Sequence, residues 1–326
     1  MTLQVWRSLA DVPLDGLRSA VTLGNFDGVH RGHQAVLGRM SSEAEDLGLR
    51  SVAITFDPHP LAVHRPQNPP TLIAGIEDRL ERIGEAGVAA VLLVEYTLEF
   101  AHQSAEEFVR DYLVDGLRAA RVVIGHDTKF GWGNEGHAET MRELGERYGF
   151  EVEVLDFEGT GLDGGRRWSS TWVRELLEVG DVTRAAEVLG RPHCLRGEVI
   201  HGDALGRTIG FPTANLEVYA GMIPAHGVYA AWFTVVEPGV STDGAALVGK
   251  PLPAAVSVGI NSTVGGTTLR VEAHLIGLPD QDLYGVRARL DFVDRRRDMA
   301  DFGSIEALTV ALAEDVVWCR EVLGLG

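Results

Sequence analysis

His30 and His33 lie at the predicted start of a helix, directly after a β-branched run that ends near Asn25. The first N–H groups of a helix are unpaired and its dipole is positive there, so an anion is favoured at this point. Imidazole groups add hydrogen-bond donors, and Gly32 between them leaves room for a phosphate to approach. A histidine pair with this spacing is, in isolation, more often a metal pair or two surface residues. The strand-loop-helix setting and the flanking glycines favour nucleotide binding instead.

A second candidate site is the glycine-rich segment 202–215. Its glycines allow the backbone to wrap with N–H groups pointing inward, which makes a nest for phosphate oxygens. Pro212 fixes the turn, while Thr213 and Asn215 offer the hard oxygen ligands that Mg²⁺ prefers. A glycine-rich loop taken alone is more often a plain turn. The sequence has no G-x-x-x-x-G-K-[ST] segment, so phosphate binding here would not use a Walker loop.

The first half of the chain must position the histidines, and it alternates β-branched runs with amphipathic helical stretches. Five runs are predicted to be strands, at residues 20–25, 51–56, 89–95, 121–125 and 151–157. Between the third and fourth runs, Ser104 and Glu107 have capping-box spacing at the start of a helix that runs toward Leu117. This pattern predicts a doubly wound α/β domain with a parallel sheet. Ligands bind beyond the carboxyl ends of such strands, so chemistry is expected after the first, second and fourth runs.

The pattern changes near Gly190, Arg191 and Pro192, where a helical segment ends and strand-like runs take over. The predicted domains are therefore residues 1–190 and 191–326. Strand candidates in the second half are residues 228–236, 254–260, 269–278 and 286–293, which indicate a small barrel or sandwich. A last helix is predicted to start near Ser304 and to pack across the β domain with an apolar stripe.

Composition limits the classes of function that the chain can have. The 326 residues fit two domains, each large enough to bury a core. The formal charge of 29 minus 47, or −18, repels polyanions, so we expect no nucleic-acid partner and no binding to anionic lipid. No apolar run approaches the length of a membrane span, and no signal-peptide pattern is seen, so a cytoplasmic location is expected. Cys194 and Cys319 are expected to be buried rather than disulfide-bonded.

Several segments of the first half resemble one known family. The segment 24–33 resembles the G-x-F-D-x-x-H-x-G-H signature of the adenylyl- and cytidylyltransferase superfamily. The segments TFDPHP at 55–60 and SSTWVR at 169–174 are similar to segments of the prokaryotic bifunctional riboflavin kinase/FAD synthetase family. The loop GHDTKFG at 125–131 resembles a family loop in which an aromatic residue usually stands where Thr128 is. By this resemblance the nucleotide-binding residues are Gly24, Asn25, Phe26, Asp27, Gly32, Asp127, Ser169, Ser170 and Thr171.

The resemblance also implies catalytic roles. His30 and His33 would stabilise charge on the ATP α-phosphate while the phosphate of FMN attacks it, and Arg174 would help to hold the departing pyrophosphate. Adenylyl transfer depends on positioning, electrostatic stabilisation and a metal ion rather than on a covalent nucleophile, which agrees with these residue types. Taken alone, the segment 169–174 is equally well explained as an ordinary N-cap and first helical turn.

The segment 202–215 closely resembles the G-x-x-x-G-R-x-x-G-F-P-T-A-N signature of riboflavin kinases. Thr213 and Asn215 would then bind Mg²⁺, and Glu272 would be the catalytic base that takes the proton of the riboflavin 5′-hydroxyl. The remaining nucleotide-binding residues would be Gly202, Gly206, Arg207, Gly210, Phe211 and Pro212. His274, two residues after Glu272, is expected to be structural. Ser262 and Val264 depart from the usual N-P-T-F segment.

The resemblance spans the whole chain and implies a Rossmann-like nucleotidyltransferase domain with a parallel sheet, followed by a small antiparallel β-barrel kinase domain with a C-terminal helix. It implies that the chain phosphorylates riboflavin to FMN and adenylylates FMN to FAD, using ATP and Mg²⁺. The sequence does not predict an oligomeric state.

Two other classes of function are compatible with parts of the sequence. Gly131, Gly133 and Gly136 satisfy G-x-G-x-x-G between a strand and a helix, with Asp156 at a suitable distance, as in an NAD-dependent oxidoreductase. That hypothesis leaves both the histidine segment and the FPTAN segment unexplained. The third hypothesis is a non-catalytic flavin-binding protein, which the departures at Thr128 and Val264 mildly favour.

Overall fold

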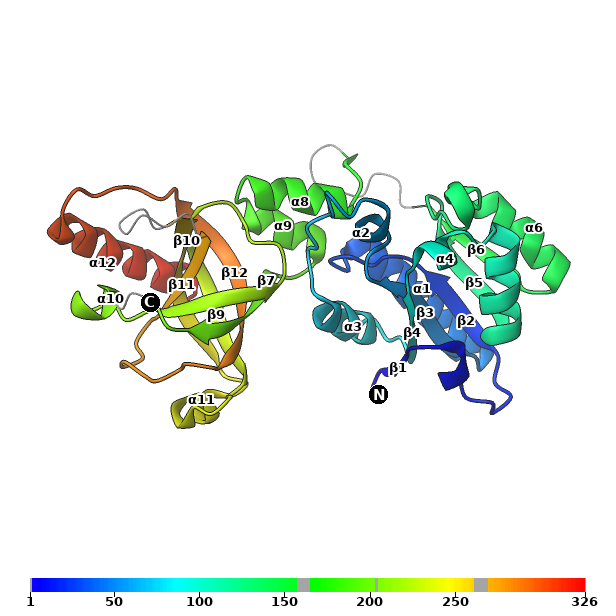
Figure 1. The fold of residues 1–326 in the computed structure, drawn as a ribbon, viewed down its shortest axis with the longest axis horizontal. Coiled ribbons are helices and arrows are strands. Elements are labelled where there is room, and N and C mark those ends of the chain that lie inside the picture. The colour runs from blue at the N-terminus through cyan, green and yellow to red at the C-terminus, as the bar shows by residue number, and fades with distance from the viewer. Residues whose placement is uncertain (1, 157–164, 203–204, 261–268, 326) are drawn as a thin grey trace. The chain divides into compact units, whose positions relative to one another are not determined.

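The computed structural model describes residues 2–156, 165–202, 205–260 and 269–325. The chain forms two compact units (Figure 1). One unit comprises residues 1–71 and 76–169, and the other comprises residues 72–75 and 170–326. The undescribed residues within these ranges are left out of the description. The predicted boundary at residues 190 and 191 stays a prediction. Helix α9 (Val182–Leu189) ends in a left-handed Gly190, and strand β7 starts at His193.

The first unit contains a parallel six-stranded sheet in the order β1-β4-β3-β2-β5-β6. Its strands are β1 (Gln4–Trp6), β2 (Ser19–Leu23), β3 (Arg50–Asp57), β4 (Ala90–Glu95), β5 (Ala119–Gly125) and β6 (Glu151–Leu155). Strands β3 and β4 follow β2 in the chain and lie on one side of it. Strand β5 then pairs with the other side of β2. The switch in strand order therefore falls between β2 and β5, which is where ligands bind in open parallel sheets. The doubly wound α/β prediction is confirmed.

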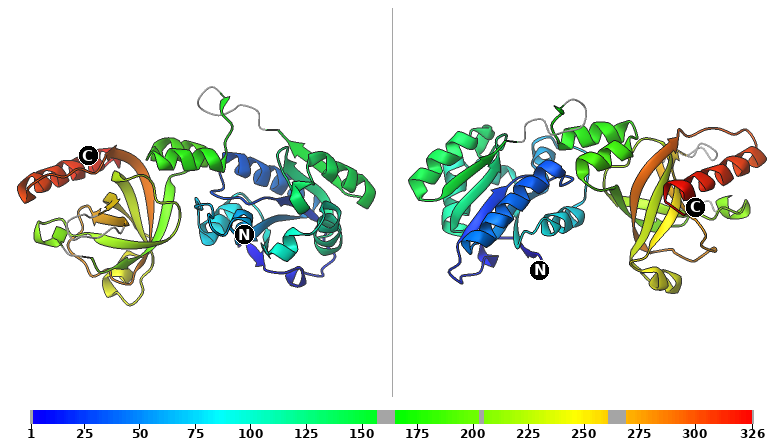
Figure 2. Two further views of the ribbon diagram at one scale, coloured as in Figure 1. Left: turned by 45° about the horizontal axis from the view of Figure 1, so that its top comes forward. Right: turned by 180° about the vertical axis from the view of Figure 1, so that it is seen from behind.

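Helices cover both faces of this sheet (Figures 1 and 2). They are α1 (Arg31–Leu47), α2 (Pro60–His64), α3 (Ile76–Glu85), α4 (Leu98–Ala101), α5 (Ala105–Phe108), η2 (Val109–Gly116) and α6 (Ala138–Tyr148), with short turns η1 (Leu9–Asp11) and η3 (Trp132–Asn134). Alternate residues of β3 serve different cores because successive strand side chains point to opposite faces. Ala53 packs with Met40 of α1 and Ile83 of α3. Ile54 packs in the other core, with Leu113 of η2.

Two local predictions were incomplete: the type of helix that follows Ser104, and the number of strands in the sheet. The predicted capping box is present, since the Glu107 N–H donates to Ser104 Oγ at 3.2 Å and the Ser104 N–H donates to Glu107 Oε2 at 2.8 Å. The helix that follows is α-helical only to Phe108 and continues as the π-helical turn η2. Strand β1 was not predicted, because three residues are too few to show an alternating pattern.

The second unit is a closed barrel in the order β10-β11-β8-β7-β12-β9, in which all six pairs are antiparallel. Its strands are β7 (His193–Ile200), β8 (Ala214–Ala220), β9 (Gly227–Glu237), β10 (Pro251–Ile260), β11 (Leu269–Leu275) and β12 (Arg287–Arg297). Its helices are α8 (Ser170–Glu178), α9, α10 (Leu205–Thr208), α11 (Thr242–Leu247) and α12 (Ile305–Val322). The barrel prediction is confirmed, although β7 and β8 were missed.

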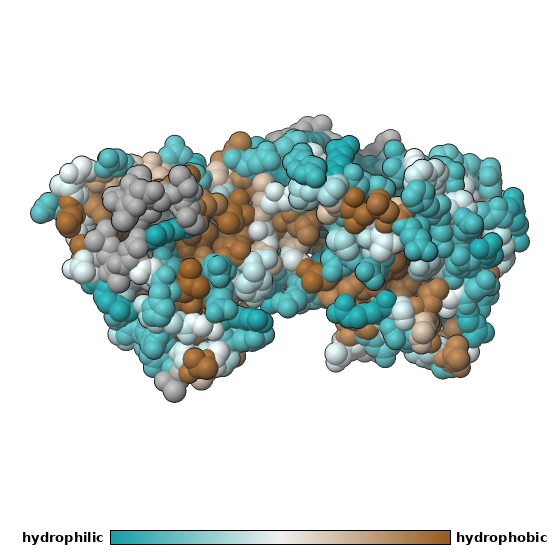
Figure 3. All heavy atoms as spheres, viewed as in Figure 1, coloured by the Kyte–Doolittle hydropathy of each residue, from teal (hydrophilic) through white to brown (hydrophobic). Residues whose placement is uncertain are grey.

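The C-terminal helix α12 packs on the barrel as predicted, with Ser304 as its N-cap. Buried Cys319 and Leu323 contact Ala230 of β9 and partly buried residues of β10 and β12. Both cysteines are buried and neither forms a disulfide, also as predicted. In the part of the chain that the structure describes, no helix is long and apolar enough to cross a membrane. Hydrophilic side chains cover much of the face shown in Figure 3.

Candidate active sites

The loop between β2 and α1 holds its residues in unusual backbone conformations. Phe26 and Val29 have φ values of 48° and 41°, in the left-handed region that non-glycine residues seldom adopt. The Val29 N–H donates to the Phe26 carbonyl at 3.0 Å, which closes the turn. His30 then caps α1, with the His33 N–H pointing at His30 Nδ1 at 3.4 Å. The predicted start of the helix beside the histidines is confirmed.

The two histidines form one stacked pair at the head of α1. Their ring centroids lie 3.7 Å apart with an angle of 21° between the planes, and Phe26 packs edge-on against His33 at 5.3 Å. Burial, together with the positive charge of Arg167, lowers the pKa of His33 to about 3. His33 is therefore a neutral imidazole at physiological pH. Its buried Nδ1 has no hydrogen-bond partner among the described residues.

A side chain at position 32 would crowd this loop. A Cβ at this position would lie 3.2 Å from two ring atoms of His30 and 3.7 Å from the Trp168 carbonyl oxygen. The segment that contains Arg167 and Trp168 therefore passes close to the first turn of α1. Whether Gly32 also admits a phosphate stays a prediction.

Arg167 is a cation of this site that sequence analysis missed. Its Nη2 lies 2.8 Å from Asp127 Oδ1, and its Nη1 lies 3.4 Å from His126 Nε2. Because Asp127 follows β5, this ion pair lies at the strand pair where the sheet order switches. The available signal was the RR dipeptide at 166–167, which Trp168 separates from the SST segment.

Arg79 of α3 is a second missed cation, and its side chain is only 2% exposed. It donates from Nη1 to the Asn25 carbonyl at 2.9 Å, an oxygen that also accepts from Thr55 Oγ1 at 3.2 Å. Burial lowers the pKa of Arg79, and the charges of Asp27 and Asp57 oppose this effect. Arg79 thus fixes the loop after β2, in which Asp27 is also buried.

The segment 169–174 begins a helix, as its N-cap interpretation requires. Ser169 directly precedes α8, and Ser170, Thr171 and Arg174 lie in the first turns of that helix. Helix α8 belongs to the second unit, whereas the histidines belong to the first. The approach of these residues to the histidines stays a prediction.

The glycines of the alternative NAD hypothesis have packing roles. A Cβ at Gly131 would lie 2.5 Å from the Ala105 backbone nitrogen, and one at Gly136 would lie 2.7 Å from the Phe130 ring. Phe130 and Gly136 exchange backbone hydrogen bonds, so the loop closes on itself. Asp156 is paired with His126 at 3.1 Å. These contacts account for Gly131 and Gly136 without a dinucleotide, and Gly133 has a φ of 60°, which favours glycine.

In the second unit, the glycine-rich segment folds back against strand β8. A Cβ at Gly202 would overlap the amide of Asn215, and one at Gly206 would overlap the Phe211 carbonyl oxygen. Gly210 has a φ of 85°, which favours glycine. Asp203 and Ala204, like the departures at Ser262 and Val264, lie outside the described residues.

Glu272 of β11 is aligned directly with Asn215 of β8 across the antiparallel pair. Directly opposed residues project from the same face of a sheet. Val271, Ala273 and Leu275 are buried, whereas Glu272 is half-buried, so Glu272 and Asn215 lie on the outer face of the barrel. Arg270 Nη1 lies 3.9 Å from Glu272 Oε1.

His274 supports the loop that leads to Thr213. Its Nδ1 lies 2.9 Å from the Pro212 carbonyl oxygen, and its ring packs edge-on against Phe211 at 5.3 Å. A carbonyl only accepts, so Nδ1 is the protonated nitrogen in this contact. This arrangement agrees with the structural role predicted for His274.

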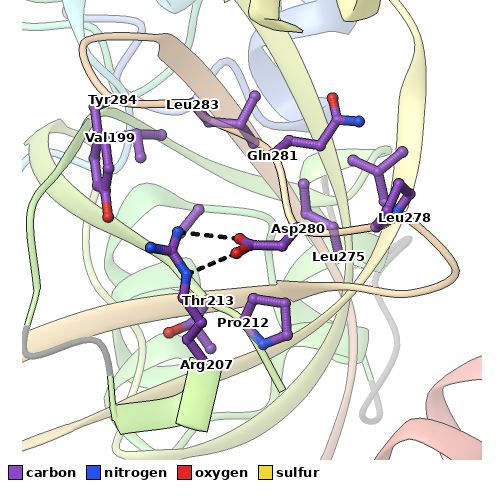
Figure 4. Close-up of a pocket in the computed structure, with 12 residues that line it drawn as sticks. Val199, Arg207, Pro212, Thr213, Leu275, Leu278, Asp280, Gln281, Leu283 and Tyr284 are labelled. Carbon is purple, nitrogen blue, oxygen red and sulfur yellow. Dashed lines mark hydrogen bonds and ion pairs between the residues drawn. The ribbon is translucent and has the colours of Figure 1, made fainter. Parts of the chain in front are cut away.

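A pocket of about 430 Å³ opens beside this loop (Figure 4). Its wall is mainly apolar, with Val199, Leu275, Leu278 and Leu283, and Tyr284 adds an aromatic ring. Thr213 lies on the pocket wall and is separated by one residue from Asn215.

Arg207 and Asp280 form an ion pair at this pocket (Figure 4). Arg207 Nε lies 2.7 Å from Asp280 Oδ2, and Nη2 lies 3.0 Å from Oδ1. Asp280 raises the pKa of Arg207 further, so this side chain is a permanent cation. Asp280 was not predicted to be a site residue, because only the fold brings it to the glycine-rich segment.

These two arrangements are those of an enzyme that handles nucleotides at two separate sites, one at a sheet crevice and one on a barrel. Residues 15–171 match the FAD synthetase family and residues 189–323 match the riboflavin kinase family. The chain is 35% identical over 318 residues to the bifunctional riboflavin kinase/FMN adenylyltransferase of Escherichia coli K12, covering 98% of this chain and 96% of that protein. It is 33% identical to the protein of that name from Bacillus subtilis, covering 91% and 90%. The chain belongs to the bifunctional riboflavin kinase/FMN adenylyltransferase family.

A solved structure has a similar fold over the whole chain. The match has a TM-score of 0.84 and 30% identity, and it covers 98% of this chain and 99% of the other. That protein, from Streptococcus pneumoniae, is titled a macrolide-efflux protein. The likeness extends to both the sheet and the barrel.

Proposed function

We propose that this chain makes FAD in two ATP-dependent steps. Riboflavin and ATP give FMN and ADP on the barrel, and FMN and a second ATP give FAD and pyrophosphate at the sheet crevice. The observation that carries the proposal is that two segments of one chain match the two enzyme families, as in the bifunctional relatives. The proposed division of labour assigns adenylyl transfer to residues 1–190 and the kinase to residues 191–326.

In the adenylyl transfer, the phosphate of FMN attacks the ATP α-phosphorus and the bond to the pyrophosphate breaks. This step requires no base, because the attacking oxygen is already an anion. His30 and His33 donate hydrogen bonds to the α-phosphate oxygens at the head of α1, where the helix also favours negative charge. A neutral His33 still has one N–H to donate.

The other predicted residues of this site position the nucleotide. The loop of Gly24, Asn25, Phe26 and Asp27 lies at the switch between β2 and β5, next to Asp127 after β5. Ser169, Ser170, Thr171 and Arg174 are proposed to hold the departing pyrophosphate. Their hydroxyl and guanidinium donors at the start of α8 support this role.

In the kinase step, the riboflavin 5′-hydroxyl attacks the γ-phosphorus of ATP and ADP leaves. Glu272 takes the hydroxyl proton on the outer face of the barrel. The adenosine of ATP is proposed to lie in the apolar pocket, with its phosphates extending past Thr213 toward Asn215. Gly202, Gly206, Gly210, Phe211 and Pro212 shape the loop around them, and Arg207 supplies positive charge.

Mg²⁺ is proposed as the metal of both steps. In the kinase, Thr213 and Asn215 supply one hydroxyl and one amide oxygen, which are hard ligands that suit Mg²⁺. The described residues contain no cluster of three or more His, Cys, Asp or Glu side chains that could hold a metal alone. An ion held by Thr213 and Asn215 would neutralise charge on the substrate phosphates.

The proposed partners are small molecules only: riboflavin, FMN, FAD and ATP. The absence of nucleic-acid binding and the cytoplasmic location stay predictions from the sequence. Incubating the protein with riboflavin, ATP and Mg²⁺ and separating the flavins by chromatography tests the function. FMN should appear first and FAD should follow. Unchanged riboflavin, or FMN that never becomes FAD, would overturn one or both proposed activities.

A further inference from the structure

The pocket of the second unit contains one pair of opposite charges in an otherwise mainly apolar lining. Arg207 comes from α10 in the glycine-rich segment, and Asp280 comes from the segment that joins β11 to β12. The two side chains meet through two parallel contacts of 2.7 and 3.0 Å (Figure 4). The ion pair thus links two segments that border the same pocket.

Arg207 is well placed to exchange the Asp280 carboxylate for another anion. The Arg207 and Asp280 side chains are 49% and 46% exposed, so water and salt screen the attraction between them. An exposed ion pair of this kind favours its paired state over its separated state by a factor of only about one to five. A phosphate group carries more charge than a carboxylate and accepts the same two parallel N–H bonds from an arginine.

We propose that Asp280 is a positioning residue of the kinase that competes with the ATP phosphates for Arg207. In the free enzyme the Asp280 carboxylate holds Arg207 at the pocket. When the nucleotide enters, a phosphate replaces the carboxylate on Nε and Nη2 of Arg207. Asp280 thereby raises the KM for ATP in the kinase step, and its charge has no part in proton transfer. This inference rests on the proposed binding of ATP in this pocket.

Asp280 fits this role better than Gln281 and Asp282, its neighbours in the sequence. Gln281 also lines the pocket but carries no charge, and Asp282 accepts a hydrogen bond from the Tyr284 N–H at 3.2 Å. Among the pocket-lining residues, Asp280 is therefore the carboxylate that can release a cation to the ligand.

The test is the steady-state kinetics of FMN formation by wild type, Asp280→Asn, Arg207→Gln and the double variant. Asp280→Asn keeps the size of the side chain and should lower the KM for ATP by about two- to fivefold with kcat nearly unchanged. Arg207→Gln should raise the KM for ATP. In the Arg207→Gln background, Asp280→Asn should have no further effect, because the competition has been removed.

Glu237→Gln is the matched control. It removes one carboxylate from the exposed ion pair with Arg287 in the same unit, outside the residues that line the pocket. It should leave the KM for ATP unchanged. A higher KM in Asp280→Asn, an unchanged KM, or the same decrease in both backgrounds would overturn the role of Asp280. If wild type made no FMN at all, the proposed kinase activity itself would fail.

Discussion

Glu272 and Asn215 stand opposite each other across the β11 and β8 pair, on the outer face of a closed barrel. This register places the Glu272 carboxylate opposite the Asn215 amide. Asn215 lies two positions after Thr213, which lines the pocket. The proposed base Glu272 and the proposed Mg²⁺ ligand Asn215 are thus cross-strand neighbours, although Glu272 lies 57 positions after Asn215 in the sequence. The relationship depends on strand register, because a shift of one residue would turn Glu272 toward the barrel interior.

Glu272→Gln should slow the kinase by roughly 10²- to 10⁴-fold, because a general base contributes about that factor. The amide has similar size and cannot accept the hydroxyl proton. FMN formation measured with saturating ATP checks this, and adenylyl transfer from supplied FMN serves as the internal control. A kinase rate equal to that of wild type would remove Glu272 from the mechanism.

His33→Ala should abolish FAD formation and leave FMN formation intact. The substitution removes a donor from the first turn of α1, in the unit that lacks the barrel. Both products can be followed in one reaction with riboflavin and ATP. Equal loss of the two activities would contradict the assignment of separate sites.

The pKa of His33 predicts how acid affects stability. In the unfolded chain the group titrates near its ordinary value of 6.5, whereas in the folded protein the pKa is about 3. Between these values the unfolded chain binds more protons, so the contribution of His33 to the free energy of unfolding is lost as pH falls from about 6.5 toward 3. Urea unfolding at several pH values should show a weaker acid dependence in His33→Gln than in wild type.

Arg167→Gln provides a spectroscopic test of the same site. The substitution removes the positive charge that helps to lower the pKa of His33, so this pKa should rise. Titration of the histidine ring signals by NMR measures it directly. Arg142→Gln, which removes a cation from an exposed pair with Glu139, should leave the value unchanged. A pKa that stays near 3 in Arg167→Gln would contradict the proximity of Arg167 and His33.

Arg79→Met should lower adenylyl transfer by about tenfold or more and leave the kinase unaffected. It removes the Arg79 donor from the Asn25 carbonyl, which Thr55 Oγ1 also contacts, and it removes a buried cation from the vicinity of Asp27 and Asp57. Arg79→Lys should restore part of the rate, because it keeps the charge. Steady-state rates for both steps test this, and equal rates in wild type and Arg79→Met would contradict the role of Arg79.

The fold class was predictable because its signals are local. Alternating β-branched runs predicted five of the six strands of the sheet, and the GNFDGVHRGH segment predicted the histidine pair at the head of α1. The missed barrel strands β7 and β8 contain charged residues and a glycine, and they become strands through pairing with distant segments. The residue pattern within one segment does not reveal its pairing with a distant segment.

Arg79, Arg167 and Asp280 could not be found in the same way. Each acquires its importance from a partner far away in sequence: Arg79 from Asn25, Arg167 from Asp127 and Asp280 from Arg207. Surface arginines and aspartates are common, and none of the three stands in a segment that sequence analysis had singled out as a site. Their contacts form only when the sheet and the barrel fold.

Complementation between two inactive variants tests the central claim most directly. His33→Ala and Glu272→Gln are mixed with riboflavin, ATP and Mg²⁺, and the flavins are separated by chromatography. Because the FMN made by one protein is a substrate for the other, the mixture should form FAD, while His33→Ala alone should stop at FMN and Glu272→Gln alone should leave nearly all riboflavin unchanged. A mixture that forms no FAD, or a single variant that forms it at the wild-type rate, would contradict two separate sites in one chain.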